Sequence, residues 1–497
     1  MRKSLLVSLF FSLAVQAQHQ HDHPVELGKL GTVNFKSTCS QKEISRAVAM
    51  MHSFWYGPAE EAFRRVAASD PACAMAHWGV AMANYHPIWA PPTPDEMRTG
   101  KAAAEQARSI KAGSERERDY IAAINAFYAE SDKLDHATRA KAYEQAMEKL
   151  AAKYPKDEEA SIFHALAMLG TASPNDKSYA NQKRAAEILN RVLDKRPEHP
   201  GIAHYIIHSY DYPELASLAL AAARAYAKIA PGSPHALHMP SHIFTRLGLW
   251  DESISSNIAS AEKAKTYVIT IKPGLTSFDE LHAIDYLVYA YLQQGDEEKA
   301  RALVDQVQRV GGTAIYNPNF AAAYALAAVP ARYALERRRW DEAARLTVKP
   351  ESFPWKNFPY AEANTHFARA IGAARSGDLN TAKAAVDRLA AIRQTLVEQK
   401  NSYWAEQVEI QRLSGLAWLA HSAGLRDEAQ RLMRSAADLE DRTEKHPVTP
   451  GAIIPARELL AEMLLEDGKA KEAMAEAERS LKVSPKRKNA EGIVARK

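Results

Sequence analysis

Apolar and small residues recur around glycine turns along this chain, and this recurrence constrains its fold more than any other feature. In the clearest copy, Gly295 and Asp296 make the turn, and apolar residues on both sides of it face inward: Leu287, Tyr291, Ala300, Val304 and Val307. The same spacing returns around Gly377, Gly424 and Gly468. Because residues three, four and seven apart lie on one face of an α-helix, each copy indicates two helices joined by a glycine turn.

Looser copies occupy the N-terminal half, where Pro71, Pro197 and Pro231 follow the second helix. No strand-type alternation is sustained. Two helices with a glycine turn and a closing proline form the unit of a tetratricopeptide repeat (TPR). Such units pack on their neighbours, so a chain of 497 residues can form one array. The sequence predicts an all-α, TPR-type helix-hairpin solenoid, wound as a right-handed superhelix with a concave central groove.

The first residues are typical of a cleaved signal peptide. Arg2 and Lys3 precede an apolar run that is too short to span a bilayer comfortably, and Ala17 ends an acceptable cleavage site. We expect a signal peptide over 1–17, a flexible or extended histidine-containing lead-in over 18–39, and N-terminal repeats with histidine-rich central helices over 40–270. C-terminal repeats are expected over 271–490. The mature protein is predicted to be periplasmic or secreted, without a transmembrane span.

The net charge bears on the class of ligand, and the two cysteines bear on the cross-linking of the chain. The formal net charge is +4 and no block of lysine and arginine occurs, which gives no basis for nucleic-acid binding. Cys39 and Cys73 are the two cysteines. In an oxidising compartment they are expected to form a disulfide across the N-terminal cap, and the alternative is two buried free thiols.

Histidines gather on three predicted first helices of successive repeats. His204, His208 and Asp211 are spaced i, i+4, i+7, so they share one helix face. His238 and His242 repeat the i, i+4 spacing, and Pro240 between them must start or kink a helix. The third group is His282 with Asp285, three residues on. First helices line the concave surface, so the three groups are expected to face one groove.

This pattern is compatible with a bound transition metal. Two imidazoles four residues apart on a helix can bind one ion, and a nearby carboxylate can be a ligand or orient an imidazole. The predicted ligands are His204, His208, Asp211, His238, His242, His282 and Asp285. Imidazole and carboxylate suit zinc, copper, iron or nickel, and the composition does not choose among them. The alternative is a polar groove wall without metal.

Further polar side chains are predicted to line the same groove. They are His235, Tyr205, Tyr210, Tyr286, His366 and Arg369. His366 and Arg369 are spaced to point one way, so Arg369 could hold an anionic group.

Several longer strings resemble a family of large exported bacterial TPR proteins. They include "HPGIAHYIIHSYDYPELA", "HALHMPSHIFTRLGLWDESI" and "VTPGAIIPARELLAEMLLEDGKAKEA". The resemblance covers nearly the whole chain after the predicted signal peptide. It implies the fold and export, and it implies no particular reaction.

Three functions follow as hypotheses. The first is a binding or scaffold protein whose His/Asp-lined groove binds a metal and takes a peptide, a protein or a small molecule. The second is a metal-dependent enzyme that uses the His/Asp cluster, for which no catalytic residue is assigned. The third is a structural envelope scaffold without metal, in which the histidines only pack. We favour the first, because no nucleophile or phosphate-loop motif is visible.

Overall fold

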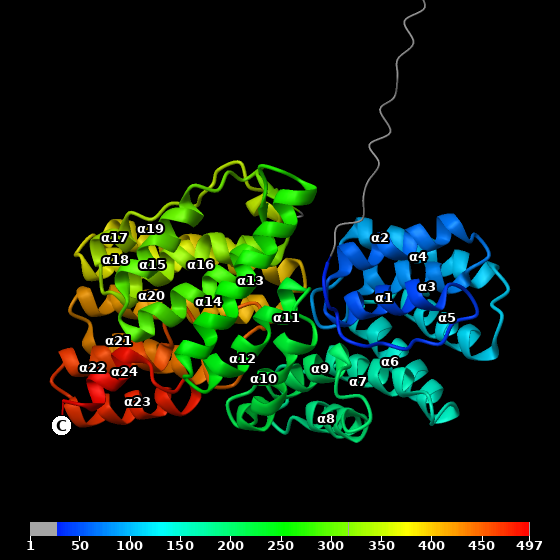
Figure 1. Ribbon diagram of the computed structural model, residues 1–497. Coiled ribbons are helices and arrows are strands. Elements are labelled where there is room, and N and C mark those ends of the chain that lie inside the picture. Colours follow the sequence, from blue (N-terminus) through cyan, green and yellow to red (C-terminus); the bar gives the residue numbers. More distant parts are fainter. Residues whose placement is uncertain (1–26, 317, 497) are drawn as a thin grey trace, which may run out of the picture.

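The computed structural model describes residues 27–316 and 318–496, and it confirms the predicted all-α solenoid (Figure 1). Its first half contains α1 (Gln41–His52), α2 (Tyr56–Ser69), α3 (Ala74–Tyr85), α4 (Pro94–Ser109), α5 (Glu115–Tyr128), α6 (His136–Lys153), α7 (Glu158–Gly170), α8 (Ala180–Leu193), α9 (Pro200–Tyr210), η1 (Ala216–Ala219), α10 (Leu220–Ile229), α11 (Pro234–His238), α12 (Pro240–Arg246) and α13 (Trp250–Ile271).

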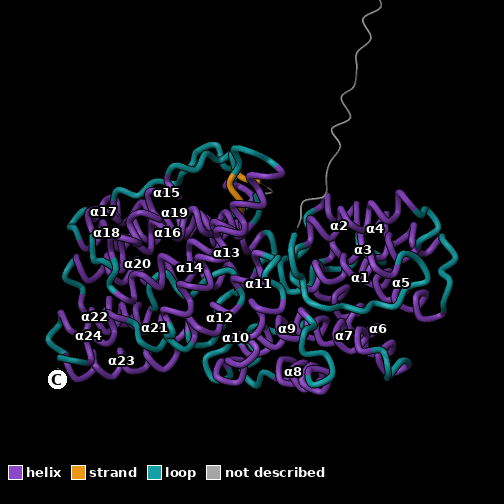
Figure 2. The backbone as a smooth tube through the Cα atoms, in the orientation of Figure 1, coloured by secondary structure: helices purple, strands orange, loops and turns teal. Residues whose placement is uncertain are grey.

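The second half contains β1 (Thr276–Ser277), α14 (Phe278–Gln294), α15 (Glu297–Gln308), β2 (Ile315–Tyr316), α16 (Phe320–Glu336), α17 (Trp340–Ala344), η2 (Trp355–Asn357), α18 (Pro359–Arg375), α19 (Leu379–Glu398), α20 (Ser402–Ser422), α21 (Arg426–Glu440), α22 (Ala456–Glu466), α23 (Ala470–Val483) and α24 (Lys488–Val494). The two short strands pair in parallel, with Thr276 opposite Ile315 (Figure 2). The expected boundary near residue 270 falls at the end of α13.

Helix hairpins form where the glycine pattern predicts them. Gly295 ends α14 with a φ of 79°, a left-handed conformation that a residue with a Cβ adopts at a cost. The next residue, Asp296, caps α15 by accepting a hydrogen bond from the Lys299 N–H. The chain therefore reverses within two residues, and α14 and α15 pack as neighbours.

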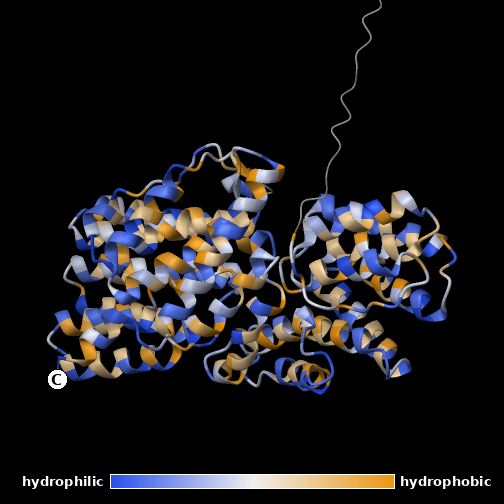
Figure 3. Ribbon diagram, viewed as in Figure 1, coloured by the Kyte–Doolittle hydropathy of each residue, from blue (hydrophilic) through white to orange (hydrophobic). Residues whose placement is uncertain are grey.

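The helices follow one another along the molecule. Helices α1 to α7 form the blue and cyan half in Figure 1, α13 to α24 form the green, yellow and red half, and α8 to α12 lie between them. Apolar residues occur in every helical layer (Figure 3), so burial extends along the array instead of converging on one centre. This is the expected consequence of repeats that contact their neighbours.

The described part of the lead-in packs against the array. Residues 27–39 form neither a helix nor a strand, and Leu27, Leu30 and Phe35 are buried. The Thr32 N–H also donates to the carbonyl oxygen of Glu198, at 2.8 Å. Apolar side chains therefore dock the segment 27–39 between helices. The predicted signal peptide and residues 18–26 lie outside the described residues.

Two further features concern the ends and the surface of the array. Cys39 and Cys73 form a disulfide with a Cα–Cα distance of 5.6 Å, which joins the lead-in to the start of α3. The last helix, α24, runs past the predicted end at 490. Among the described residues, none of the helices combines the length and the apolar character needed to cross a bilayer.

Candidate metal centre

Six histidines meet where four helices converge near the middle of the chain. They come from α9, α11, α12 and α14, which lie close together in Figure 1. Helix α11 ends at His238, and Pro240 takes the first position of α12. At that position a proline is favoured, because the missing backbone N–H would have no partner within the helix. The resulting break separates His238 from His242. All six imidazoles are buried.

The six side chains form two groups of three, and not one shared site. The first triad is His204 and His208 of α9 with His235 of α11, and the second triad is His238 of α11, His242 of α12 and His282 of α14. Within each triad, one ligand atom from every residue lies within 4.8 Å of the others. The histidines of the three predicted groups therefore lie in two adjacent triads, because α11 presents His235 to one triad and His238 to the other.

The second triad has well-determined proton positions on two of its rings. His238 Nδ1 lies 2.6 Å from Asn257 Oδ1, and Asn257 donates its amide to the Ser253 carbonyl oxygen. The Asn257 oxygen must therefore accept a proton from His238 Nδ1. His242 Nδ1 donates to Asp211 Oδ2 at 2.9 Å. In the neutral rings both Nε2 atoms are consequently lone-pair donors, and they face each other at 3.0 Å.

The first triad shows a similar arrangement. His204 Nδ1 donates to the carbonyl oxygen of His52 at 2.6 Å, which leaves Nε2 with its lone pair. His208 Nε2 lies 3.1 Å from that atom. His235 Nε2 is buried and has no hydrogen-bond partner among the described residues.

Burial keeps the imidazoles neutral. Burial, followed by the neighbouring imidazole of His242, lowers the pKa of His208 and of His282 to about 3. The pKa values of His204, His235 and His238 are also lowered well below the usual range, first by burial and then by adjacent histidines. Neutral imidazole is the form that binds metal ions.

Asp211 supports the second triad from the previous repeat. Helix α9 ends at Tyr210, so Asp211 leaves the helix face that it was predicted to share with His204 and His208. Its carboxylate also accepts from Arg246 Nε at 2.8 Å and from Lys445 Nζ at 3.1 Å. Burial would raise the pKa of Asp211, but these two cations and His242 hold it well below its usual range. Asp211 orients His242 and is not placed as a metal ligand.

The predicted ligand Asp285 points elsewhere. Its Oδ1 atom lies 3.3 Å from Arg332 Nε, and both side chains are fully buried. Arg332 also donates to the carbonyl oxygen of Ala452 at 2.7 Å. Position 285 lies three residues after His282, so the two share a broad helix face, but Arg332 of α16 attracts the carboxylate away from the imidazole. The ligand assignment for Asp285 is corrected.

Only some of the predicted groove residues lie beside the two triads. Tyr286 OH lies 3.3 Å from His242 Nε2 and donates to backbone carbonyls of the loop between α21 and α22. Tyr205 is fully buried and contacts His52 Nδ1 at 2.8 Å. Tyr210 is partly buried against the core. His366 lies 3.1 Å from Glu362, and no described contact brings it or Arg369 to the triads. His235 belongs to the first triad.

A third buried group consists of two histidines and one glutamate, which contact one another. His52 Nε2 and His199 Nε2 each lie 3.0 Å from one oxygen of the buried Glu159 carboxylate. Both carboxylate oxygens and both Nε2 atoms are therefore already paired with one another, while His199 Nδ1 is buried without a hydrogen-bond partner among the described residues.

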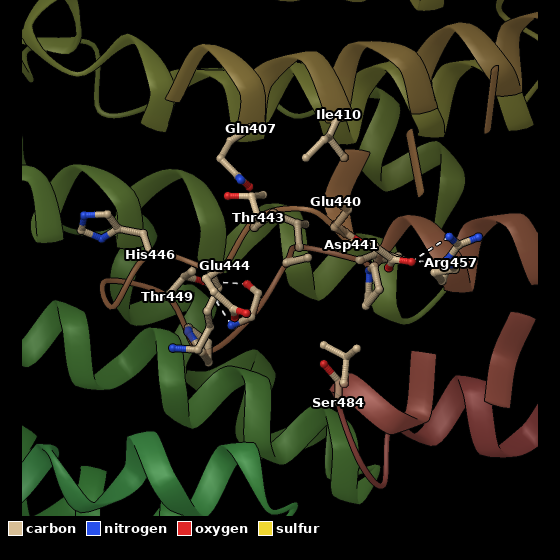
Figure 4. A pocket seen from close by; sticks show the side chains of 18 of the residues that line it. Gln407, Ile410, Glu440, Asp441, Thr443, Glu444, His446, Thr449, Arg457 and Ser484 are labelled. Atoms are coloured by element: carbon tan, nitrogen blue, oxygen red, sulfur yellow. Dashed lines mark hydrogen bonds and ion pairs between the residues drawn. The ribbon is translucent and has the colours of Figure 1, made fainter. Parts of the chain in front are cut away.

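His446 is not among the predicted site residues, and it borders two cavities. The smaller cavity, about 10 Å³, is also lined by His208, His235, His242 and His282. The larger, about 600 Å³, is bounded by α20, the loop between α21 and α22, and the residues after α23. In Figure 4, Gln407 and Ile410 of α20 lie across this cavity from Ser484, and the loop that carries Glu444, His446 and Thr449 lies between them.

Aromatic rings form one wall of the larger cavity. Tyr360 and Trp404 stack with ring centroids 4.3 Å apart, and His446 lies 5.1 Å from Trp404. Arg246 and Lys445, which bind Asp211, also line the cavity. A molecule in this cavity would therefore contact the residues that position His242.

These features define an all-α helical-repeat protein with two buried three-histidine clusters. No protein-family model matches the sequence. None of the curated proteins matches it.

Among solved structures, the chain is similar to several helical proteins over most of its length. The human IFIT1 dimer with m7Gppp-AAAA has a TM-score of 0.35 and 11% identity, over 82% of this chain and 89% of that chain. Naa15/Naa10 bound to HypK-THB has a TM-score of 0.25 and 12% identity, over 87% and 62%. The APC/C hetero-tetramer Cut9-Hcn1 has a TM-score of 0.24 and 10% identity, over 92% and 96%. No ligand or partner of these proteins is transferred to this chain.

Proposed function

We propose that this protein is a metal-binding helical-repeat protein and that the second triad holds a transition-metal ion. The observation that carries the proposal is the pair of Nε2 atoms of His238 and His242, which face each other at 3.0 Å. Both rings have their Nδ1 protons committed to Asn257 and Asp211. Two facing lone pairs repel unless a cation or a hydrogen-bond donor lies between or beside them, and the Tyr286 hydroxyl near His242 Nε2 lies closer to two backbone carbonyl oxygens. A metal ion removes that repulsion.

The spacing fits a metal ligand pair. Two imidazole nitrogens on one tetrahedral zinc ion, each at the usual bond length, are about 3.3 Å apart. The nitrogens of His238 and His242 need to separate by only a few tenths of an ångström to reach that value. His282 supplies the third nitrogen. Hydrogen bonds from the remote nitrogens of two ligand rings to an amide and a carboxylate are the usual support of a histidine metal site.

Elemental analysis tests this proposal. The sample is the full chain without a purification tag, with His19, His21 and His23 replaced by glutamine so that the N-terminal segment does not contribute. After reloading with zinc, copper or iron and desalting, the chain should retain metal. His282→Gln should lose the ion of the second triad, because His282 makes no side-chain hydrogen bond among the described residues and its loss leaves the network intact.

His77→Gln is the matched control, since His77 lies on α3, away from both triads. It should retain the same metal content as the parent. A parent chain that holds no metal after exposure to all three ions would contradict the proposal.

Export remains part of the proposal. Support comes from the apolar run after Arg2 and Lys3 and from the disulfide, which suits an oxidising compartment. Cell fractionation followed by N-terminal sequencing should recover the chain outside the cytoplasm with Gln18 as its first residue. Recovery of cytoplasmic protein that begins at Met1 would contradict export.

A metal-dependent enzyme is the second candidate, favoured by the cavity of about 600 Å³ that shares His446 with the histidine clusters. Three protein ligands leave a fourth position for water or substrate in a catalytic site. Azide should then change the visible absorption of the copper(II)-loaded chain. An unchanged spectrum would indicate a closed site, and the binding function would stand without catalysis.

A further inference from the structure

We infer that the first triad binds a second metal ion, so that the chain holds an adjacent pair of ions, copper being favoured. This inference rests on the proposed function of the second triad. It assigns His204, His208 and His235 as the ligands of the additional ion.

The i, i+4 histidine pairs of the two triads are equivalent in the repeat, whereas the third histidines, His235 and His282, are 47 residues apart. His204 and His238 are 34 residues apart, and so are His208 and His242. That is the period of a tetratricopeptide repeat. Each triad therefore consists of an i, i+4 pair from one repeat and a single histidine from the next: His235 joins the first pair and His282 joins the second. The paired Nε2 atoms are 3.1 Å apart in the first triad and 3.0 Å apart in the second.

The first triad also contains an unsatisfied nitrogen. A proton on His208 Nε2 could satisfy His204 Nε2, since His204 donates through Nδ1 to the backbone of His52. That proton gives no hydrogen bond to His235 Nε2, which is buried without a hydrogen-bond partner in the described part of the chain. Leaving such an atom unpaired destabilises the folded chain. A metal ion bound by all three nitrogens satisfies the whole group.

The two sites face a common space. The cavity of about 10 Å³ is lined by His208 and His235 from the first triad and by His242 and His282 from the second. Its size approaches that of one water molecule. The ring centroids of His208 and His242 are 6.1 Å apart, and those of His235 and His238 are 6.0 Å apart. One water or hydroxide in this space would be a shared ligand of both ions.

The donor set indicates the class of metal. Both triads offer three neutral imidazoles, and no described carboxylate belongs to either triad. Imidazole sites suit copper, zinc, iron and nickel, and for a given site copper(II) binds most tightly among the divalent first-row ions. Copper is therefore the probe of choice, with zinc as the redox-inactive comparison.

The test counts ions per chain in matched variants. The parent is the full chain with His19, His21 and His23 replaced by glutamine, stripped with a chelator and reloaded with copper(II) or with zinc. His235→Gln and His282→Gln each remove one ligand from one triad, and neither residue makes a side-chain hydrogen bond among the described residues. We expect two ions in the parent, one in each single variant and none in the double variant.

The outcomes separate the two proposals. A parent with one ion that His282→Gln removes and His235→Gln leaves in place overturns this inference while the proposed function stands. A parent without metal overturns both. Circular dichroism and thermal melting check that each variant is folded, and the count in the parent decides the matter even if a variant is not.

Electron paramagnetic resonance of the copper(II)-loaded parent tests whether the ions are adjacent. Two neighbouring copper(II) ions that share a ligand couple, so the signal per copper should be several-fold weaker in the parent than in either single variant. An equal, full signal per copper in the parent and the variants would overturn the pairing.

Discussion

His242 Nδ1 lies 2.9 Å from Asp211 Oδ2, and this contact joins two repeats through a carboxylate that Arg246 and Lys445 also bind. All four side chains are buried or nearly so. Asp211 thereby fixes the tautomer of His242 and balances two cations.

Asp211→Ala should weaken both stability and metal binding. Removing one partner of a buried ion pair typically destabilises a protein by about 3–5 kcal/mol, because the remaining charges are left uncompensated. Loss of a residue that orients a metal-binding histidine typically lowers metal affinity by about 10–100-fold. Urea unfolding and competition with a chromophoric chelator measure the two effects. Asp194→Ala, at an exposed position, is the control and should change neither.

The disulfide should stabilise the N-terminal cap. Cys39 and Cys73 are 34 residues apart, and closing a loop of that length is expected to contribute about 3–4 kcal/mol by restricting the unfolded chain. Replacing both cysteines by serine should lower the thermal midpoint, and a reductant should lower the midpoint of the parent but not of the variant. An equal response of both proteins to reductant would show that the bond is not formed in solution.

The C-terminal segment should stabilise the fold through Arg487. This side chain is fully buried and pairs with Glu458 at 2.6 Å and with Glu336 at 2.7 Å. Arg487→Ala removes the buried cation that the two carboxylates share, and leaves Glu336 with Asn489 and Glu458 with Arg338 as side-chain partners. We therefore expect a loss of about 3–5 kcal/mol in the free energy of unfolding. Chemical denaturation measures it. Arg496→Ala, at an exposed position, should stay within about 0.5 kcal/mol of the parent.

Acid should destabilise the metal-free protein from pH 6.5 downward. Burial, followed by the nearby Arg139 and His86, lowers the pKa of His136 from 6.5 to about 4. Between these values the unfolded chain binds a proton that the folded chain does not, so stability is complete above pH 6.5 and falls as the pH approaches 4.

His136→Gln isolates this contribution. Between pH 7 and pH 5, the parent should lose about 2 kcal/mol more of its unfolding free energy than the variant does. Urea midpoints at the two pH values measure the difference. Identical pH profiles in the parent and the variant would contradict the assigned shift.

The sequence alone determined those features that depend on neighbours in the chain. The period of an α-helix places His204 beside His208, and the turns at Gly295, Gly377 and Gly468 follow from residues that tolerate a left-handed backbone. The all-α repeat fold was predictable for the same reason, since one local pattern recurs along the chain.

Only the tertiary structure decided which distant residues meet. It divided the histidines into two triads, turned Asp211 toward His242, drew Asp285 to Arg332, and brought His446 to the same cavities. It also buried Arg487 in a segment that is polar by composition. These contacts depend on how helices from different repeats pack and on where helices such as α9 and α11 end. No spacing within one helix encodes that packing.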